Sequence, residues 1–125
     1  MRSKILLTLA LLAGTCAADM AWAAGDAAKG EAVFKRCAIC HSIEKGAPDG
    51  LGPNLFGIVG QKAGSHAGFP YSAALQNSGV TWTQANLIKW SAGPARMIPG
   101  TKMMFPGITS KTQQADLAAY LATKK

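Results

Sequence analysis

Two cysteines and a histidine lie within five residues, Cys37-Ala38-Ile39-Cys40-His41. This C-x-x-C-H spacing is the attachment signature of a c-type heme. Thiols three positions apart lie on one face of a helix, a turn apart, where both can form thioether links to the vinyl groups of one porphyrin. The adjacent imidazole can then reach the iron. We therefore predict one heme c, bound covalently through Cys37 and Cys40, with His41 as an iron ligand.

Three other kinds of site use a C-x-x-C pair. A zinc knuckle needs two further ligands, and the remaining candidates are Cys16, His66 and scattered carboxylates. A thioredoxin-like redox pair follows a strand, and nothing strand-like precedes Cys37. A structural disulfide across two intervening residues is strained. The pattern favours the heme over all three.

The N-terminus has the pattern of a secretory signal. Arg2 and Lys4 precede an apolar run over residues 5–13, and an A-x-A cleavage site follows at 21–23. The apolar run is too short to span a bilayer, so we expect no stable membrane anchor. We predict that residues 1–23 are a cleaved signal peptide.

The remaining residues, 24–125, are enough for one domain, which export would place in the periplasm. Cys16 raises the question of lipidation, but Thr15 stands where a lipidation box expects a small residue. Cleavage lowers the formal charge only from +7 to +6. A positive excess favours partners with acidic surfaces. Nucleic acid is not an expected partner, because the chain is exported and has no basic-aromatic binding motif.

Helical signals flank a long irregular stretch. Helices are predicted over about 26–37, 72–78 and 81–91, with a terminal helix opened by Ser110. Asp26 can cap the first, and Thr81 and Ser110 each begin a capping-box pattern. Gly30 costs about 1 kcal/mol in a helix interior, which suggests that another helix crosses closely there. No useful period-2 alternation appears, so the predicted fold class is all-α.

Residues 42–70 are rich in glycine and proline, which predicts successive turns rather than strands. A long loop in a small domain is typical of a segment that wraps something, and a flat apolar cofactor fits. The Pro53 carbonyl is free to accept a hydrogen bond from the far nitrogen of His41. Such a bond would orient the ring and make it a more electron-rich ligand.

A second irregular segment, residues 98–107, begins and ends with Pro-Gly and contains adjacent methionines. Because it is not helical, these methionines are not a helical core stripe. A thioether is a soft neutral ligand that favours ferrous iron. Iron held by protein on both faces has no place for a substrate, which favours an electron carrier.

The chain from about 25 to 125 resembles a class I cytochrome c, close to mitochondrial cytochrome c and its soluble bacterial relatives. The resemblance is collinear over nearly the whole predicted mature chain. It is carried by Gly30 to Phe34, Cys37 to His41, Gly52-Pro53-Asn54-Leu55, Gly68-Phe69-Pro70-Tyr71, Gly79-Val80-Thr81-Trp82, Pro99-Gly100-Thr101-Lys102-Met103 and Asp116 to Leu121.

The resemblance implies a fold of about four to five helices and long loops around one heme. It implies that His41 and Met103 are the axial ligands, while Met97 and Met104 serve ordinary packing. Other matching residues contact the cofactor: Pro53 at the histidine, Thr101 near the methionine, and Tyr71 and Trp82 at a buried propionate. Near the heme, Gln61, Leu75 and Trp90 depart from the family's pattern.

These features predict a monomeric periplasmic electron carrier and no enzyme. It would work between a membrane quinol-oxidising complex or dehydrogenase and a terminal oxidase or similar acceptor. Its redox partners would dock acidic surfaces on a basic ring around the heme edge. The candidates for that ring are Lys35, Arg36, Lys45, Lys62, Lys89, Arg96 and Lys102.

Two alternatives remain open. The protein could be the dedicated heme subunit of one periplasmic dehydrogenase, which the sequence does not distinguish from a free carrier. A heme that loses Met103 could instead act as a peroxidase or gas sensor, but no distal acid–base pair is evident. His66 is expected to be a loop histidine and not a ligand.

Overall fold

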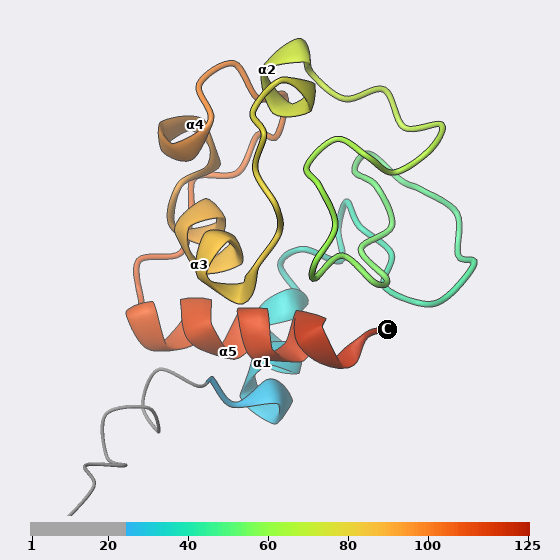
Figure 1. The fold of residues 1–125 in the computed structure, drawn as a ribbon. Coiled ribbons are helices and arrows are strands. Elements are labelled where there is room, and N and C mark those ends of the chain that lie inside the picture. The colour runs from blue at the N-terminus through green and yellow to red at the C-terminus, as the bar shows by residue number, and fades with distance from the viewer. Residues whose placement is uncertain (1–24) are drawn as a thin grey trace, which may run out of the picture.

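The computed structural model describes residues 25–125, which fold into five helices joined by long loops (Figure 1). The described part contains no strand, and its one isolated antiparallel bridge joins Lys62 and Thr81. The all-α prediction is confirmed. The predicted signal peptide and Cys16 lie outside the described residues. The helices are α1 (Ala27–Phe34), α2 (Ala73–Gln76), α3 (Gln84–Ala92), α4 (Pro94–Met97) and α5 (Lys111–Thr123).

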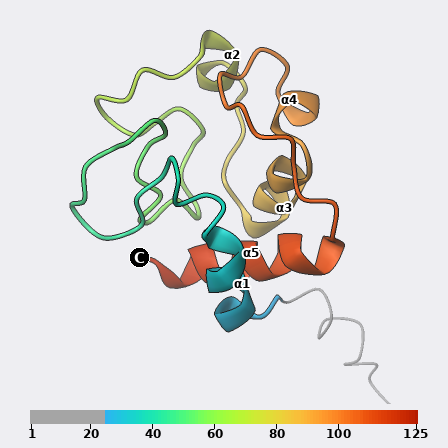
Figure 2. The same ribbon diagram turned by 180° about the vertical axis from the view of Figure 1, so that it is seen from behind.

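The first and last helices cross, and α1 and α5 form the most extensive helix–helix contact (Figures 1 and 2). A Cβ atom on Gly30 would overlap the Asp116 carbonyl and lie 2.8 Å from the Tyr120 Cβ. The Phe34 and Tyr120 rings pack beside this point with centroids 5.4 Å apart. Glycine is therefore required at the crossing, as the sequence predicted.

Helix α1 begins as expected but ends earlier. The Asp26 carboxylate accepts from the Lys29 amide, and a carboxylate oxygen of Asp116 accepts from the Asp26 amide at 2.7 Å, which ties the helix start to α5. The helix ends at Phe34, so the predicted extension to Cys37 is wrong. The following residues form consecutive turns instead.

Helix α3 starts later than predicted because a different threonine caps it. The Thr83 hydroxyl accepts from the Asn86 amide at 3.1 Å. Thr81, the predicted cap, pairs with Lys62 instead, and its carbonyl accepts from the Asn86 side chain at 2.8 Å. Ser110 does cap α5, as predicted, by accepting from the Gln113 amide.

Helix α4 has no counterpart among the predicted helices. Gly93-Pro94 follows directly after α3, which ends at Ala92, and the proline occupies the first turn of a short new helix. Proline suits that position because its missing amide has no helical partner there and its φ is already helical. The Ile98 amide closes the turn onto the Pro94 carbonyl at 2.9 Å.

The core joins the helices to the loops. Residues 42–70 lie on one side of the molecule in both ribbon views, while α3 and α4 lie on the other and α2 lies at the top between them. The Gly57 amide donates to the Lys124 carbonyl at 2.6 Å, which fastens the loops to the end of α5. The buried apolar residues are Val33, Phe34, Ile58, Ala63, Leu75, Trp82, Leu87, Ile98, Ile108, Leu117, Ala118, Tyr120 and Leu121.

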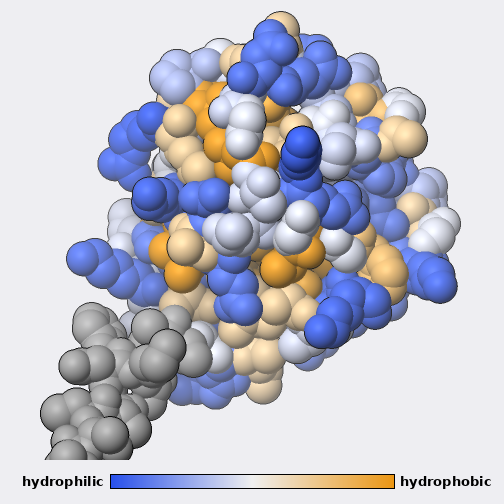
Figure 3. All heavy atoms as spheres, viewed as in Figure 1, coloured by the Kyte–Doolittle hydropathy of each residue, from blue (hydrophilic) through white to orange (hydrophobic). Residues whose placement is uncertain are grey.

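Hydrophilic side chains project from much of the surface in Figure 3, with hydrophobic patches between them. Among residues 25–125, no helix has the length and apolar character needed to cross a membrane.

Candidate functional site

The segment from Cys37 to His41 is a compact pair of turns directly after α1. The Cys40 and His41 amides both donate to the Cys37 carbonyl, at 3.0 and 2.9 Å. Both cysteines are half-buried free thiols. Burial raises the pKa of the Cys37 thiol, and the nearby Arg36 opposes that shift. The pair is therefore held as two thiols on one tight turn, which suits covalent attachment to two points of one cofactor.

The His41 imidazole has a defined proton position. Its Nδ1 lies 2.7 Å from the Pro53 carbonyl oxygen, which can only accept, so Nδ1 carries the proton. Nε2 is then free to bind a metal. Burial lowers the pKa of His41 below its usual value, while the hydrogen bond to Pro53 partly opposes the shift. The predicted hydrogen bond between His41 and Pro53 is present.

Gly52 supports the same ring. A Cβ atom at this position would overlap the imidazole, with Nδ1 at 2.6 Å and Nε2 at 2.8 Å. The Gly52 amide also donates to the Cys40 carbonyl at 2.9 Å. The turn before Pro53 is thus packed flat against the histidine and bonded to the cysteine beside it. Only glycine fits there.

The methionine segment lies on the other side of the molecule, with α2 to α4 (Figures 1 and 2). Met103 is half-buried, and its amide donates to the Thr101 hydroxyl at 3.3 Å. Met104 is 96% exposed, so the expectation that it serves ordinary packing is wrong. Met97 is half-buried against the core. The two neighbouring methionines therefore differ in role: only Met103 is turned partly inward.

The two residues expected to contact a heme propionate, Trp82 and Tyr71, differ in burial and in their neighbours. Trp82 is buried, and its ring meets Trp90 edge-on at a centroid distance of 5.2 Å. Tyr71 is partly buried and packs edge-on against Phe69 at 4.9 Å. Burial raises the pKa of Tyr71, a hydrogen bond from the His66 backbone lowers it, and the Asp49 charge raises it. The Tyr71 phenol is therefore neutral near pH 7 and can donate a hydrogen bond.

The donor set fits heme c better than the alternatives. Two free thiols are followed at once by an imidazole whose Nε2 is unprotonated, and a half-buried thioether is available on a separate segment. No three side chains of the metal-binding types His, Cys, Asp and Glu gather anywhere in residues 25–125. Nothing in the described chain therefore completes a zinc site around the cysteine pair.

Comparisons with known proteins support the same assignment. The family model for cytochrome c matches residues 27–125. The cytochrome c2 of Rhodomicrobium vannielii is 50% identical over 104 residues, which cover 83% of this chain and 83% of that protein. The chain belongs to the cytochrome c family.

Other cytochromes c match over similar lengths. The cytochrome c of Guizotia abyssinica is 48% identical over 99 residues, 78% of this chain and 89% of the relative. The solved structure of cytochrome cH from Methylobacterium extorquens superposes with a TM-score of 0.75 at 50% identity, covering 80% of this chain and all 100% of that one. The cytochrome c fold predicted from the sequence is confirmed.

Membership of the cytochrome c family establishes the general function of this chain. Cytochromes c are electron carriers rather than enzymes, and this chain has the cysteine pair to which the family's heme c is covalently attached, Cys37 and Cys40. The protein is therefore a heme c electron carrier. When bound, heme c supplies a one-electron ferric–ferrous couple.

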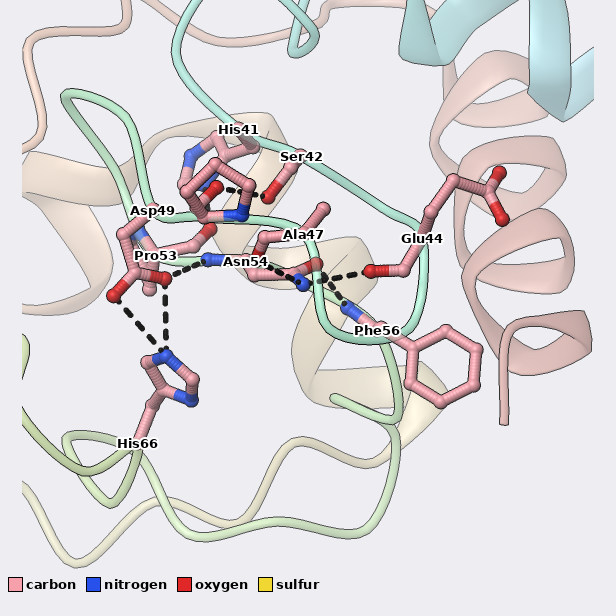
Figure 4. A network of polar contacts seen from close by, with 10 residues as sticks. His41, Ser42, Glu44, Ala47, Asp49, Pro53, Asn54, Phe56 and His66 are labelled. Atoms are coloured by element: carbon pink, nitrogen blue, oxygen red, sulfur yellow. Dashed lines mark hydrogen bonds and ion pairs between the residues drawn. The ribbon is translucent and has the colours of Figure 1, made fainter.

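Sequence reasoning missed a polar network beside His41 (Figure 4). The side chains of Asp49, Asn54 and His66 are joined to the loop that holds Pro53. Their residue types are those of ordinary turns, and their partners lie up to 17 residues apart in sequence. The expectation for His66 named it only as a loop histidine; its hydrogen bond to Asp49 had no signal in the sequence.

Proposed function

We propose that this cytochrome c holds its iron between His41 Nε2 and Met103 Sδ, as a closed six-coordinate site. The observation that carries the proposal is the His41–Pro53 hydrogen bond, which leaves Nε2 as the free nitrogen next to the cysteine pair. Met103 is favoured over Met104 because it is half-buried, whereas its neighbour is almost fully exposed. Both axial positions would then be filled by protein.

The remaining predicted residues would serve this site through contacts of their own. Pro53 orients the imidazole. Thr101 orders the chain at Met103 through the hydroxyl that accepts from the Met103 amide. Tyr71 and Trp82 would donate hydrogen bonds to a propionate, and their O–H and indole N–H are suitable donors.

We further propose that the protein works in the periplasm as a free carrier between a membrane quinol-oxidising complex or dehydrogenase and a terminal oxidase or similar acceptor. The signal-like pattern of residues 1–23 supports export. All seven predicted ring residues are exposed, which supports docking of acidic partner surfaces. The formal charge of +6 that remains after cleavage favours such partners at long range.

An optical comparison tests the closed site. The protein, expressed with heme c in the periplasm, should give a low-spin spectrum that carbon monoxide does not change. Met103→Ala should open the iron and bind carbon monoxide readily. Met104→Ala is the matched control and should behave as wild type. Carbon monoxide binding by the wild-type protein would instead favour the gas-sensor or peroxidase alternative.

A salt titration tests the docking ring. Electron transfer to an acidic redox partner should slow steeply as ionic strength rises, because exposed charges are screened within about 10 Å at 0.1 M salt. Lys102→Glu should weaken this dependence, whereas Lys111→Glu, outside the proposed ring, should not. Stable co-purification with a larger dehydrogenase would contradict the free-carrier proposal in favour of the dedicated subunit.

A further inference from the structure

A single peptide unit, the one joining Pro53 to Asn54, is hydrogen-bonded at both ends. Its carbonyl oxygen accepts from His41 Nδ1 at 2.7 Å. Its amide, which is the Asn54 N–H, donates to Asp49 Oδ1 at the same distance of 2.7 Å. An imidazole and a carboxylate are thus connected through one rigid, conjugated group (Figure 4).

The Asn54 side chain holds this unit in place. Its Nδ2 donates to the carbonyls of Glu44 and Ala47 at 2.8 and 3.0 Å, and its Oδ1 accepts from the Phe56 amide at 3.0 Å. Asn54 itself is 8% exposed. A buried side chain with three such bonds allows the peptide plane little freedom to rotate.

His66 reaches the same carboxylate from a second loop. Its Nε2 lies 3.0 and 3.2 Å from the two oxygens of Asp49, which can only accept, so Nε2 carries a proton. The two side chains are 37% and 30% exposed, so protons exchange freely with solvent. The other titratable group at this pair is Tyr71, whose pKa is raised by burial, lowered by the His66 backbone and raised by the Asp49 charge.

We propose that Asp49 is a positioning residue for the proximal ligand, acting on His41 through the Pro53–Asn54 peptide unit, and that His66 makes this action depend on pH. The proposal rests on His41 being an iron ligand. A carboxylate on the N–H end of a peptide polarises it, which makes its carbonyl a stronger acceptor. The stronger acceptor draws the Nδ1 proton and makes the imidazole a more electron-rich ligand.

The direction of the effect follows. An electron-rich ligand favours ferric iron, so a fully charged Asp49 lowers the reduction potential. When pH falls and His66 becomes an imidazolium, its positive charge offsets the negative charge of Asp49, and the reduction potential rises. When pH increases again, the proton leaves His66 and the potential falls. Histidine is the side chain whose charge normally changes between about pH 5 and 8, so the reduction potential is followed across that range.

The test compares reduction potentials across that pH range with the chemical shift of the His41 Nδ1 proton in the ferrous protein. In the wild-type protein, the potential should step down with rising pH at the midpoint that NMR gives for His66. His66→Gln should lose the step and stay at the wild-type alkaline level. Asp49→Asn keeps an acceptor for the Asn54 amide but removes the charge. It should raise the potential, lose the step and move the Nδ1 proton upfield.

Glu44→Gln is the matched control. Glu44 is a carboxylate of the same loop that pairs with Lys124 at 3.3 Å and whose side chain is not bonded to the peptide unit. This variant should keep the pH step and the Nδ1 shift. An equal change in potential for Glu44→Gln and Asp49→Asn would overturn the proposal, because simple loss of charge would explain both.

The outcomes separate this inference from the proposed function. A low-spin spectrum without carbon monoxide binding, in a protein whose potential shows no step at the His66 midpoint, overturns the inference alone. Carbon monoxide binding by the wild-type protein contradicts the proposed ligand set instead. If Asp49→Asn does not fold with heme, retention of the step in His66→Gln is sufficient to overturn the proposal.

Discussion

The two segments that present the proposed iron ligands are built differently. The histidine-side segment, residues 41–56, is cross-linked by hydrogen bonds from His41, Ser42 and Asn54 to backbone groups of its own loop. The methionine-side segment, residues 98–107, has one local side-chain bond, from the Met103 amide to Thr101 at 3.3 Å. The histidine side is therefore preorganised, and the methionine side depends more on the cofactor for its order.

The packing at the ligand residues shows a related contrast. A ring atom of His41 lies within 2.8 Å of where a side chain on Gly52 would begin. On the methionine side, Met104 is 96% exposed and Lys102 reaches the Pro70 carbonyl only at 3.4 Å. The histidine is thus tightly enclosed by its own loop and the methionine segment less so, and substitutions on the two sides should therefore differ in cost.

The largest effect is expected for Gly52→Ala. The new Cβ would overlap the His41 ring and force either the imidazole or the turn to move, at a cost of about 3 kcal/mol in the free energy of unfolding. Urea unfolding of the heme-loaded protein measures it. Gly46→Ala is the control: nothing lies within 4 Å of its Cβ, and its φ of +75° should cost only about 1 kcal/mol. Equal losses in the two variants would contradict the close packing at His41.

Asn54→Ala should come next. It leaves the carbonyls of Glu44 and Ala47 without their buried donor, and each such loss costs about 1–3 kcal/mol. We expect a loss of about 2–3 kcal/mol by urea unfolding, and faster hydrogen exchange at the Asn54 amide. A loss below about 0.5 kcal/mol, typical of surface changes, would mean that the histidine side is not preorganised by this residue.

Thr101→Val gives the corresponding change on the methionine side and a smaller effect. It removes one acceptor from a partly exposed 3.3 Å hydrogen bond, so the unfolding free energy should fall by less than about 1 kcal/mol. Slow carbon monoxide binding, which the wild-type protein should not show, should nevertheless appear in the ferrous variant, because Met103 is less well ordered. A loss as large as that of Asn54→Ala would reverse the comparison between the two sides.

The smallest effect on stability is expected for substitution of Tyr71. This residue follows Pro70, whose carbonyl accepts a hydrogen bond from Lys102 of the methionine-side segment. Burial raises the pKa of Tyr71 above its usual value near 10. The folded state therefore favours the neutral phenol, and the stability it contributes is present below pH 10 and lost as pH rises through the raised pKa. Tyr71→Phe should reduce the alkaline loss of stability and change little at pH 7. The same loss of stability at alkaline pH in Tyr71→Phe as in wild type would contradict the raised pKa of Tyr71 as its cause.

Much of the histidine side could be predicted from the sequence because its signals are local. The C-x-x-C-H spacing places the cysteines and His41 within five residues, and Pro53 follows in the same loop. Gly30 predicted a helix crossing because a glycine is costly inside a helix unless something lies against it. Asp26 and Ser110 were identified as caps because a cap needs only the next three residues.

The errors arose where several local solutions compete. Thr81 and Thr83 can both cap α3, and the choice depends on Thr81 being held by its bridge to Lys62. Gly93-Pro94 can end one helix or begin another, and here it does both. Met104 was expected to serve ordinary packing because the resemblance gave the ligand role to Met103, but the sequence does not say which side of an irregular loop faces the interior.

The sequence by itself determined the cofactor, the family and the helical class, because these depend on residue types at fixed short spacings. Only the tertiary structure decided how the ligand histidine is supported. The bonds that connect His66, Asp49 and Asn54 to the Pro53 peptide join residues from separate turns, and no periodicity or motif encodes such pairings. Their geometry exists only once the loops are folded against one another.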